Sequence, residues 1–366
     1  MRLTSATITG FRNIGAVNLK PEKRFNLLYG LNGQGKTNLL EAFYLLGSPR
    51  SFRTARLPEL IRHGGIRSEI QGIVESAGVE NDLRLVIETA GRKVGVNGKA
   101  IHKASELHGI LNAVVFSPDD TGMVRSGPES RRRYLDRAVY MGDIGYLHCW
   151  HSYQRILKQR NHLLKSADRA GLDIWTEKLA EAGAEVIERR FRFVTVLDGK
   201  LQKYYATIAG CGETSRISYQ PEGVQSRERE PVREELLKLF KRHQHSDERY
   251  GTTTAGPHRD DLIFSLNDRP LKAFGSQGQQ KSFVLALKLA EMDNLEEIFG
   301  EAPLLLLDDM SSELDSRRNH NLMEFLTARE IQVFITTTER SPALLADAPH
   351  CAVFHVEDGN LTFEGK

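Results

Sequence analysis

The sequence predicts an α/β fold interrupted by a mostly helical insertion, and three features of the chain point to it. An apolar strand runs into a glycine-rich loop and a helix near the start of the chain. A second apolar strand, which ends in two aspartates, lies far downstream, and the stretch between them has mostly helical periodicity. We therefore expect one discontinuous α/β domain at 1–118 and 251–366, and a mostly helical inserted lobe at 119–250.

The composition indicates a globular chain without a membrane segment. Of 366 residues, 40% are hydrophobic and 27% are charged, and the net charge of +2 requires any nucleic-acid-binding surface to be local. No apolar run approaches the ~18 residues that span a bilayer, and the first residues lack the order of a secretory signal. We expect a cytoplasmic protein with no membrane partner. The three cysteines, Cys149, Cys211 and Cys351, are far apart and form no Cys-x-x-Cys pair. We therefore expect them to be small buried apolar residues and not part of a disulfide framework or a zinc site.

The first α/β region begins with strands. Alternating apolar residues predict short strands in RLTSATITGF at 2–11 and GAVNLK at 15–20, and RFNLLYG at 24–30 predicts a buried strand, followed by a helix at 36–46. From 70 to 97, alternating segments separated by Gly or Asn-Asp turns predict an antiparallel meander. The segment LNAVVFSP, residues 111–118, predicts one more buried strand before the insertion.

The insertion and the second α/β region differ in pattern. Apolar residues recur at helical spacing from about 126 to 208, and 210–250 is polar and charged with at least one further helix. After residue 251 strands return at 261–266, 304–308 and 332–336, with helices between them.

A phosphate-binding loop follows the apolar strand RFNLLYG. GLNGQGKT fits G-x-x-x-x-G-K-[ST] in full and lies between an apolar strand and a helix, which is the context that this motif requires. The glycines let backbone N–H groups face the phosphates, Lys36 reaches the β and γ oxygens, and Thr37 offers a hydroxyl to Mg²⁺. A plain glycine-rich turn is the alternative. The predicted nucleotide-binding residues are Gly30, Leu31, Asn32, Gly33, Gln34, Gly35, Lys36 and Thr37.

Two aspartates follow the apolar strand LLLL. Asp308 and Asp309 come at its carboxyl end, where the ligands of open α/β sheets gather. We predict that Asp308 binds Mg²⁺ together with Thr37, and that Asp309 polarises the attacking water and acts in catalysis with Lys36. Capping of the next helix is the alternative. The sequence contains no Asn/Thr-Lys-x-Asp guanine motif, so we expect ATP rather than GTP.

Several further segments carry a resemblance to a known family. Together with the two motifs above, the chain resembles ABC-type ATPase heads of the SMC-like group, and more narrowly the RecF family of bacterial recombination and gap-repair proteins. The resemblance covers the chain nearly end to end and implies an α/β, ABC-type P-loop ATPase head with an inserted lobe. It rests on FRN, SPRSFRT, GPESRRRYLDR, TAGPHRDDL and GSQGQQKS, at 11–13, 48–54, 127–137, 254–262 and 275–282.

The resemblance assigns a role to the stretch that begins at Ser276. In ABC-type ATPases a Ser-Gly-Gly-Gln signature opens a helix and contacts the γ-phosphate of ATP bound to the other subunit; Ser276, Gly278 and Gln279 match it, and Gln277 replaces the first glycine. A Ser-x-x-Gln capping box for the following helix is the alternative, and both can hold.

Other positions of the family pattern bear on the rate of hydrolysis. The segment 311–315, SSELD, matches the D-loop of the dimer interface, and Arg12 resembles a residue that lines the nucleotide, although a surface turn explains it nearly as well. The usual switch histidine is missing, since Thr337 or Thr338 stands there. Together with Asp309 in place of the common glutamate, this implies slow hydrolysis.

Arginines and lysines of the insertion are the candidates for contact with nucleic acid. They occur near the start of one predicted helix and along the next, where a solvated helical face is the ordinary explanation. A groove that binds the phosphate backbone of nucleic acid would give a binding affinity that depends strongly on salt and little on base sequence. The predicted DNA-binding residues are Arg131, Arg132, Arg133, Arg155 and Lys158.

Two functions from different classes follow. The resemblance implies a weak Mg-dependent ATPase that forms an ATP-dependent homodimer, clamps single-stranded, double-stranded or gapped DNA, and acts with RecR and RecO in loading RecA, in replication and in the SOS response. The alternative is an ABC-type transporter ATPase subunit, which predicts a signature closer to the phosphate loop, a switch histidine and a membrane partner. A coiled-coil SMC protein needs a longer insertion, and a small-molecule kinase leaves the late signature without a role.

Overall fold

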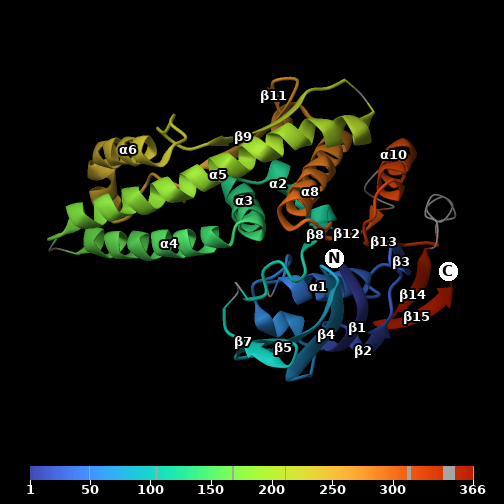
Figure 1. Ribbon diagram of the computed structural model, residues 1–366. Helices are drawn as coiled ribbons and strands as arrows, with labels where there is room; N and C mark the ends of the chain where they lie inside the picture. The colour runs from blue at the N-terminus through green and yellow to red at the C-terminus, as the bar shows by residue number, and fades with distance from the viewer. Residues whose placement is uncertain are drawn as a thin grey trace. The chain divides into compact units, whose positions relative to one another are not determined.

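The computed structural model divides the chain into two compact units, and each is considered by itself. The head unit comprises Met1–Thr121, Lys203–Gly212 and Ser276–Lys366, and the lobe unit comprises Gly122–Gln202 and Glu213–Gly275 (Figure 1). The structure describes residues 1–48, 50–103, 106–166, 169–210, 212–310, 315–340 and 351–365.

The head unit contains a six-stranded sheet that is parallel except at one edge. Its strand order is β15-β14-β3-β13-β12-β8, and only β15 runs antiparallel to its neighbour. Strands β8, β12 and β13 are buried at every residue, and β3 at every residue but its last, as expected for parallel strands covered on both faces. The bounds are β3 Phe25–Tyr29, β8 Ala113–Phe116, β12 Leu304–Leu307, β13 Val333–Thr337, β14 Ala352–Glu357 and β15 Asn360–Gly365.

A second sheet of the head unit is antiparallel. Its order is β2-β1-β4-β5-β6-β7, in which β4, β5, β6 and β7 form a meander of sequential neighbours, as the alternating pattern predicted. The bounds are β1 Arg2–Phe11, β2 Ile14–Leu19, β4 Arg67–Ser76, β5 Val79–Glu88, β6 Gly91–Val96 and β7 Lys99–Ile101.

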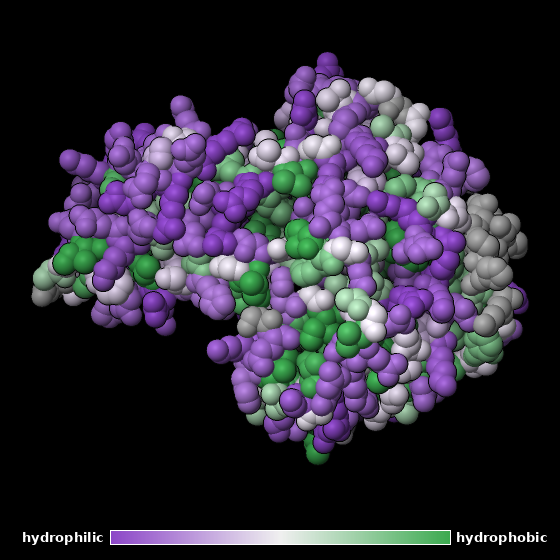
Figure 2. Space-filling view, in the orientation of Figure 1, coloured by the Kyte–Doolittle hydropathy of each residue, from purple (hydrophilic) through white to green (hydrophobic). Residues whose placement is uncertain are grey.

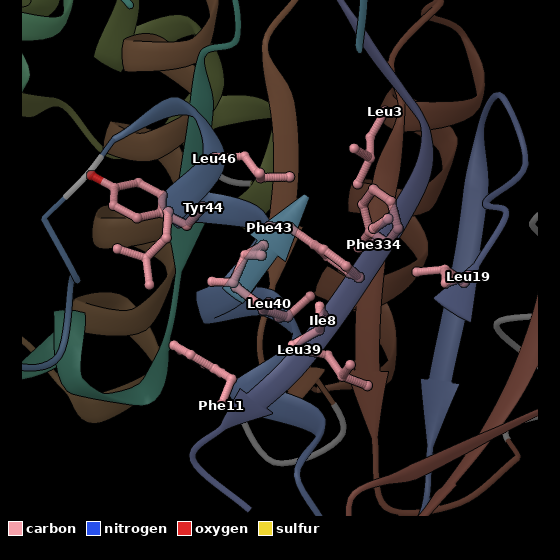
Figure 3. Close-up of a cluster of buried hydrophobic side chains, with 14 of the residues drawn as sticks. Leu3, Ile8, Phe11, Leu19, Leu39, Leu40, Phe43, Tyr44, Leu46 and Phe334 are labelled. Atoms are coloured by element: carbon pink, nitrogen blue, oxygen red, sulfur yellow. The ribbon is translucent and has the colours of Figure 1, made fainter. Parts of the chain in front are cut away.

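Helix α1, Lys36–Gly47, packs against both sheets. Nine of its residues are buried, and its leucines and aromatic residues meet side chains of β1 and β13 in the cluster of Figure 3. Each fully buried side chain of this kind contributes roughly 1.5–3 kcal/mol. The helix that follows the phosphate loop is therefore anchored in the centre of the core. Labelled members of the cluster are Leu3, Ile8, Phe11, Leu19, Leu39, Leu40, Phe43, Tyr44, Leu46 and Phe334.

Other helices complete the head unit. The 3-10 helix η1 spans Leu57–Leu60, α8 spans Gln277–Phe299 and is buried along most of its length, and α10 spans Ser316–Thr327. The last turn of α5, Leu172–Ala209, packs here through Tyr205 against Phe283 and through Tyr204 against Phe325.

The lobe unit is mostly helical, with a small three-stranded sheet of order β11-β10-β9. The predicted lobe and this unit differ at the second boundary: 251–275 belong to the lobe unit because β10 pairs with β9, so the head unit resumes at Ser276, and 203–212 belong to the head unit. Helix α2, Pro118–Arg125, begins in the head unit and enters the lobe unit at Gly122, and α5 belongs to the lobe unit up to Gln202. The other bounds are α3 Pro128–Gly142, α4 Ile144–Lys165, α6 Arg229–Tyr250, α7 Leu271–Phe274, β9 Ser215–Gln220, β10 Asp261–Leu266 and β11 Arg269–Pro270.

The surface is largely polar. On the face shown in Figure 2, hydrophilic residues cover most of the area and hydrophobic residues form separate patches. Across the described ranges, none of the helices combines the length and the apolar character needed to cross a membrane. Cys149 and Cys351 are buried as expected, and burial raises the pKa of the Cys149 thiol to about 12 and that of Cys351 to about 11. Cys211 lies outside the described residues.

Candidate nucleotide-binding site

The phosphate-binding loop adopts a backbone that requires glycine. Gly30, Gly33 and Gly35 have φ values of 154°, 80° and 113°, which L side chains rarely adopt. A Cβ atom at Gly30 would lie 2.2 Å from the carbonyl oxygen of Val356. Gly35 is the N-cap of α1 and makes no side-chain cap, so the first-turn N–H groups of α1 form an anion-binding helix end.

Lys36 lies within the curl of this loop. Its Nζ donates to the carbonyl oxygens of Gly30, at 2.5 Å, and Leu31, at 2.9 Å, and only 7% of the residue is exposed. Burial lowers the pKa of Lys36, and the negative charges of Asp309 and Asp308 oppose that shift. The predicted lysine and the two predicted carboxylates therefore share one site.

Thr37 and Asp308 are in direct contact. The Thr37 hydroxyl lies 2.9 Å from both carboxylate oxygens of Asp308, and the Thr336 hydroxyl donates to Asp308 Oδ1 at 2.7 Å. Burial raises the pKa of Asp308, while the hydrogen bonds from Thr336 and Thr37 lower it. A hydroxyl beside a carboxylate is a donor set that suits Mg²⁺ when phosphate oxygens and water supply the remaining ligands. Among the described residues no cluster of three or more His, Cys, Asp or Glu could hold a metal.

The strand order explains why residues distant in sequence meet here. Strand β13 lies between β3 and β12, and all three are parallel, so their carboxyl ends lie at one edge of the sheet. The phosphate loop follows β3, Asp308 follows β12, and Thr336 is the penultimate residue of β13. This edge therefore assembles the site from three separate segments.

Asp309 has an unusual backbone. Its φ is +51°, in the left-handed region, and its N–H donates to the Thr336 hydroxyl at 2.8 Å. A non-glycine residue in this region at a ligand site is consistent with a side chain held in a functional orientation. The Thr336 hydroxyl thus orders both aspartates, a role that the sequence reasoning missed. Strand alternation in VFITTT was the signal, because consecutive threonines of a strand point to opposite faces of the sheet.

The predicted switch positions lie at the end of β13. Thr337 is buried, and its hydroxyl donates to the carbonyl oxygen of Glu339 at 2.5 Å, while Thr338 is partly exposed. The D-loop segment 311–314 lies outside the described residues. Asp315, which follows it, caps α10 by accepting from the Arg318 N–H at 2.9 Å.

Arg12 extends along the side of the site. Its guanidinium makes a bidentate ion pair with Glu41 of α1, at 2.9 and 2.8 Å, and Glu41 also pairs with Arg53 at 3.3 Å. Arg12 and Arg53 line a cavity of about 930 Å³ together with Asn13, whose Nδ2 donates to the Gln34 carbonyl of the phosphate loop at 3.1 Å. Sequence reasoning missed Glu41 and Arg53, although a lone acid within the apolar run LLEAFYLL was a usable signal.

Ser276 forms the capping box that the sequence predicted as one of its two roles. The Ser276 hydroxyl accepts from the Gln279 N–H at 3.2 Å, and the Gln279 side chain accepts from the Ser276 N–H at 2.8 Å. Both Ser276 and Gln277 are exposed at the N-terminus of α8. Gly278 is packed against Arg318, since a Cβ atom there would lie 2.5 Å from the Arg318 guanidinium.

The predicted DNA-binding residues differ in their surroundings. Arg131 is 7% exposed and makes a bidentate ion pair with Asp261 at 2.8 Å, which contradicts its expected place on a DNA-contacting surface. Arg132 is partly buried and donates to the carbonyl oxygen of Asp260 at 2.7 Å. Arg133, Arg155 and Lys158 are exposed; Arg133 pairs with Glu129, and neither Arg155 nor Lys158 has an ion-pair partner among the described residues.

Two of the family segments meet within the lobe unit around a buried arginine. Arg190 is fully buried and pairs with Asp136 of GPESRRRYLDR at 2.7 Å, and it donates to the Pro257 carbonyl of TAGPHRDDL at 2.6 Å. Tyr146 hydrogen-bonds to Asp136, and Tyr219 hydrogen-bonds to Asp260. These segments therefore build the interior of the lobe as well as its surface.

Comparisons with known proteins identify the family of the chain. The family model described as the RecF/RecN/SMC N terminal domain matches residues 2–362. A DNA replication and repair protein RecF of Trichlorobacter lovleyi is 51% identical over 100% of this chain and 99% of its own length. A solved structure of the recombination mediator protein RecF with ATP, in the RecFOR pathway, has a TM-score of 0.90 at 34% identity and covers 99% of each chain.

A more distant structure supports the fold alone. The Smc head domain of Pyrococcus furiosus, solved with the C-terminal domain of ScpA, has a TM-score of 0.58 at 17% identity and covers 100% of this chain and 96% of its own. The α/β, ABC-type head fold is thus confirmed, and with it the ATP-binding character of the family and its place in DNA replication and repair. This chain belongs to the RecF family of SMC-like ATPases.

Proposed function

We propose that this protein is an ATP-gated DNA clamp of recombinational gap repair. ATP binding brings two subunits together, DNA is held between them, and slow hydrolysis releases it. The observation that carries the proposal is the position of Ser276, which is exposed at the start of a buried helix. None of its hydrogen bonds within the described chain reaches the phosphate loop, so its phosphate-binding role is available to a second subunit.

The phosphate loop and the two aspartates have separate roles in this proposal. Lys36 and the first-turn N–H groups of α1 bind the phosphates, and Thr37 and Asp308 hold Mg²⁺, which would neutralise phosphate charge when bound. Asp309 accepts the proton of the attacking water. Its side chain is one methylene shorter than glutamate, and threonine stands at the switch position, so we expect slow turnover.

Exposed cations of the lobe supply the DNA contacts. Arg133, Arg155 and Lys158 are available, whereas Arg131 belongs to the lobe interior. Contacts of this kind bind phosphates without reading sequence, so affinity should fall steeply with salt. We expect the preferred DNA to be gapped or to contain a junction of single and double strands.

The family suggests where the clamp works. The similar ATP-bound structure is a recombination mediator of the RecFOR pathway. We infer that RecR and RecO are the partners, that the clamp helps load RecA onto gapped DNA in the cytoplasm, and that it supports replication and the SOS response. The transporter alternative requires a membrane partner and is disfavoured by membership of a DNA-repair family.

Size-exclusion chromatography with and without Mg-ATP tests the proposal. The wild-type protein should be a monomer alone and a dimer with Mg-ATP, and Lys36→Ala should lose ATP binding. Two changes at Ser276 separate capping from phosphate binding. Ser276→Ala removes the cap at a cost of about 1 kcal/mol, whereas Ser276→Asp keeps a good cap and places a negative charge toward the partner's phosphate. Both should bind ATP and remain monomeric; normal dimerisation of Ser276→Asp would refute the assignment.

A further inference from the structure

We propose that Glu41 is a positioning residue for ATP binding, which holds Arg12 and Arg53 at the wall of the nucleotide cavity. The inference rests on the proposed contact between Arg12 and ATP. Glu41 lies one helical turn beyond Thr37 in α1, and its side chain is completely buried. It is therefore fixed to the same helix that binds the phosphates.

The carboxylate of Glu41 serves three donors from two other segments. Arg12, in the turn between β1 and β2, donates through Nε to Oε2 at 2.9 Å and through Nη2 to Oε1 at 2.8 Å. Arg53 donates to Oε2 at 3.3 Å, and the Ser51 hydroxyl hydrogen-bonds to Oε1. This carboxylate fixes the Arg12 guanidinium, because a planar bidentate pair allows little rotation, and it holds Arg53 together with Asn38, which accepts from Arg53 at 2.7 Å.

Both arginines line the cavity of about 930 Å³, whose wall also includes Asn13 and Asn38. Arg53 donates to Asn38 at 2.7 Å, Asn38 donates to Asn13 at 2.8 Å, and Asn13 donates to the carbonyl oxygen of Gln34 at 3.1 Å. Arg53 is also among the groups whose charge lowers the pKa of Asp308, although burial raises that pKa more. Arg53 thus connects through two asparagines with the loop, and Glu41 joins Arg12 to Arg53.

The net charge of the cluster formed by Arg12, Arg53 and Glu41 favours a role in binding an anionic ligand over a purely structural role. One guanidinium is sufficient to neutralise the Glu41 carboxylate, yet two lie against it. The cluster therefore keeps one net positive charge beside a cavity whose wall residue Asn13 hydrogen-bonds to the phosphate loop. A triphosphate is the ligand that this excess charge suits, since opposite charge in a partly buried site is weakly screened.

A double-mutant cycle on Mg-ATP affinity, measured by calorimetric titration, tests the inference. Arg12→Ala and Glu41→Gln should each weaken ATP binding by about tenfold, as expected for loss of a charged hydrogen-bonding group. If Glu41 acts through Arg12, the loss in the double variant should be smaller than the product of the two single losses, and any loss beyond that of the weaker single variant is the part that Glu41 contributes through Arg53. Fully multiplied effects in the double variant would overturn the positioning of Arg12.

Controls separate the possible failures. Unchanged ATP affinity in Arg12→Ala would refute the assigned Arg12 contact, whereas a loss in Arg12→Ala without one in Glu41→Gln would refute this inference alone. Glu75→Gln breaks a bidentate pair with Arg2 elsewhere in the head unit and should leave ATP affinity unchanged. Glu41→Asp keeps the buried charge but shortens the side chain, so it provides the test if Glu41→Gln is poorly folded. If Glu41 positions the arginines, Glu41→Asp should bind ATP more weakly than the wild type. If only its charge matters, the ATP affinity of Glu41→Asp should be unchanged.

Discussion

Replacement of Arg190 by methionine should destabilise the lobe unit strongly. Arg190 is fully buried, and its guanidinium donates to Asp136 at 2.7 Å, to the Pro257 carbonyl at 2.6 Å and to the Tyr146 hydroxyl at 2.9 Å. Methionine can fill much of the volume but supplies no donor. The Asp136 carboxylate and the Pro257 carbonyl would lose a partner, and the nearby charge of Asp260 would lose compensation.

The expected loss follows from the burial of the pair. Breaking a buried ion pair by removing one partner costs about 3–5 kcal/mol. Asp136 retains 22% exposure and keeps its hydrogen bond with Tyr146, so we expect the lower end, about 3 kcal/mol. Arg192→Met is the matched control, because Arg192 is 69% exposed and pairs with Glu188 on the surface; it should lose about 0–1 kcal/mol.

Urea unfolding followed by tryptophan fluorescence measures this loss. The sequence has two tryptophans, Trp150 and Trp175, and both lie in the lobe unit. Trp150 is also a sensitive reporter, since its ring centroid lies 5.0 Å from the Arg190 guanidinium carbon. A loss for Arg190→Met that is no larger than that for Arg192→Met would refute the reasoning.

Three further predictions concern pH, hydrolysis and the loop. Burial lowers the pKa of His258 to about 4, so the unfolded chain binds a proton that the folded protein does not, and stability should fall as the pH drops from about 6.5 to about 4. Urea midpoints across this range should vary less in His258→Gln than in the wild type, and equal slopes would contradict the assignment. Asp309→Asn should keep ATP affinity but lower single-turnover hydrolysis roughly 10²-fold or more; an unchanged rate would remove Asp309 from the proton transfer. Gly30→Ala should abolish ATP binding in a titration because its Cβ would meet Val356, whereas Gly91→Ala, which has open space, should bind normally.

Contiguous motifs were predictable because local backbone geometry determines them. The glycine pattern at 30–37 specifies a loop that curls around phosphate, and the four leucines before Asp308 specify a buried strand that ends in acids. Ser276 and Gln279 specify a helix cap within one turn, and the structure contains it. In each case the residues that explain the feature are neighbours in sequence, so periodicity and spacing were sufficient to identify it.

Features that depend on distant partners were not predictable in this way. The sequence predicts that the arginines at 131–133 form one exposed patch. Arg131 is instead buried in an ion pair with Asp261, a residue that only the fold brings close to it. The boundary between the lobe unit and the head unit at residue 276 follows from the pairing of β10 with β9, and no local sequence pattern predicts that pairing.

The sequence alone therefore determined that the chain carries a glycine-rich strand-to-helix loop, two aspartates at the end of an apolar strand and a capped helix at Ser276, since each is encoded by adjacent residues. Tertiary structure decided that Thr336 orders both aspartates, that Glu41 holds two arginines, and which cations of the lobe are exposed. The physical reason is that burial and ion pairing depend on the partner that the fold brings into contact, and that partner can lie anywhere in the chain.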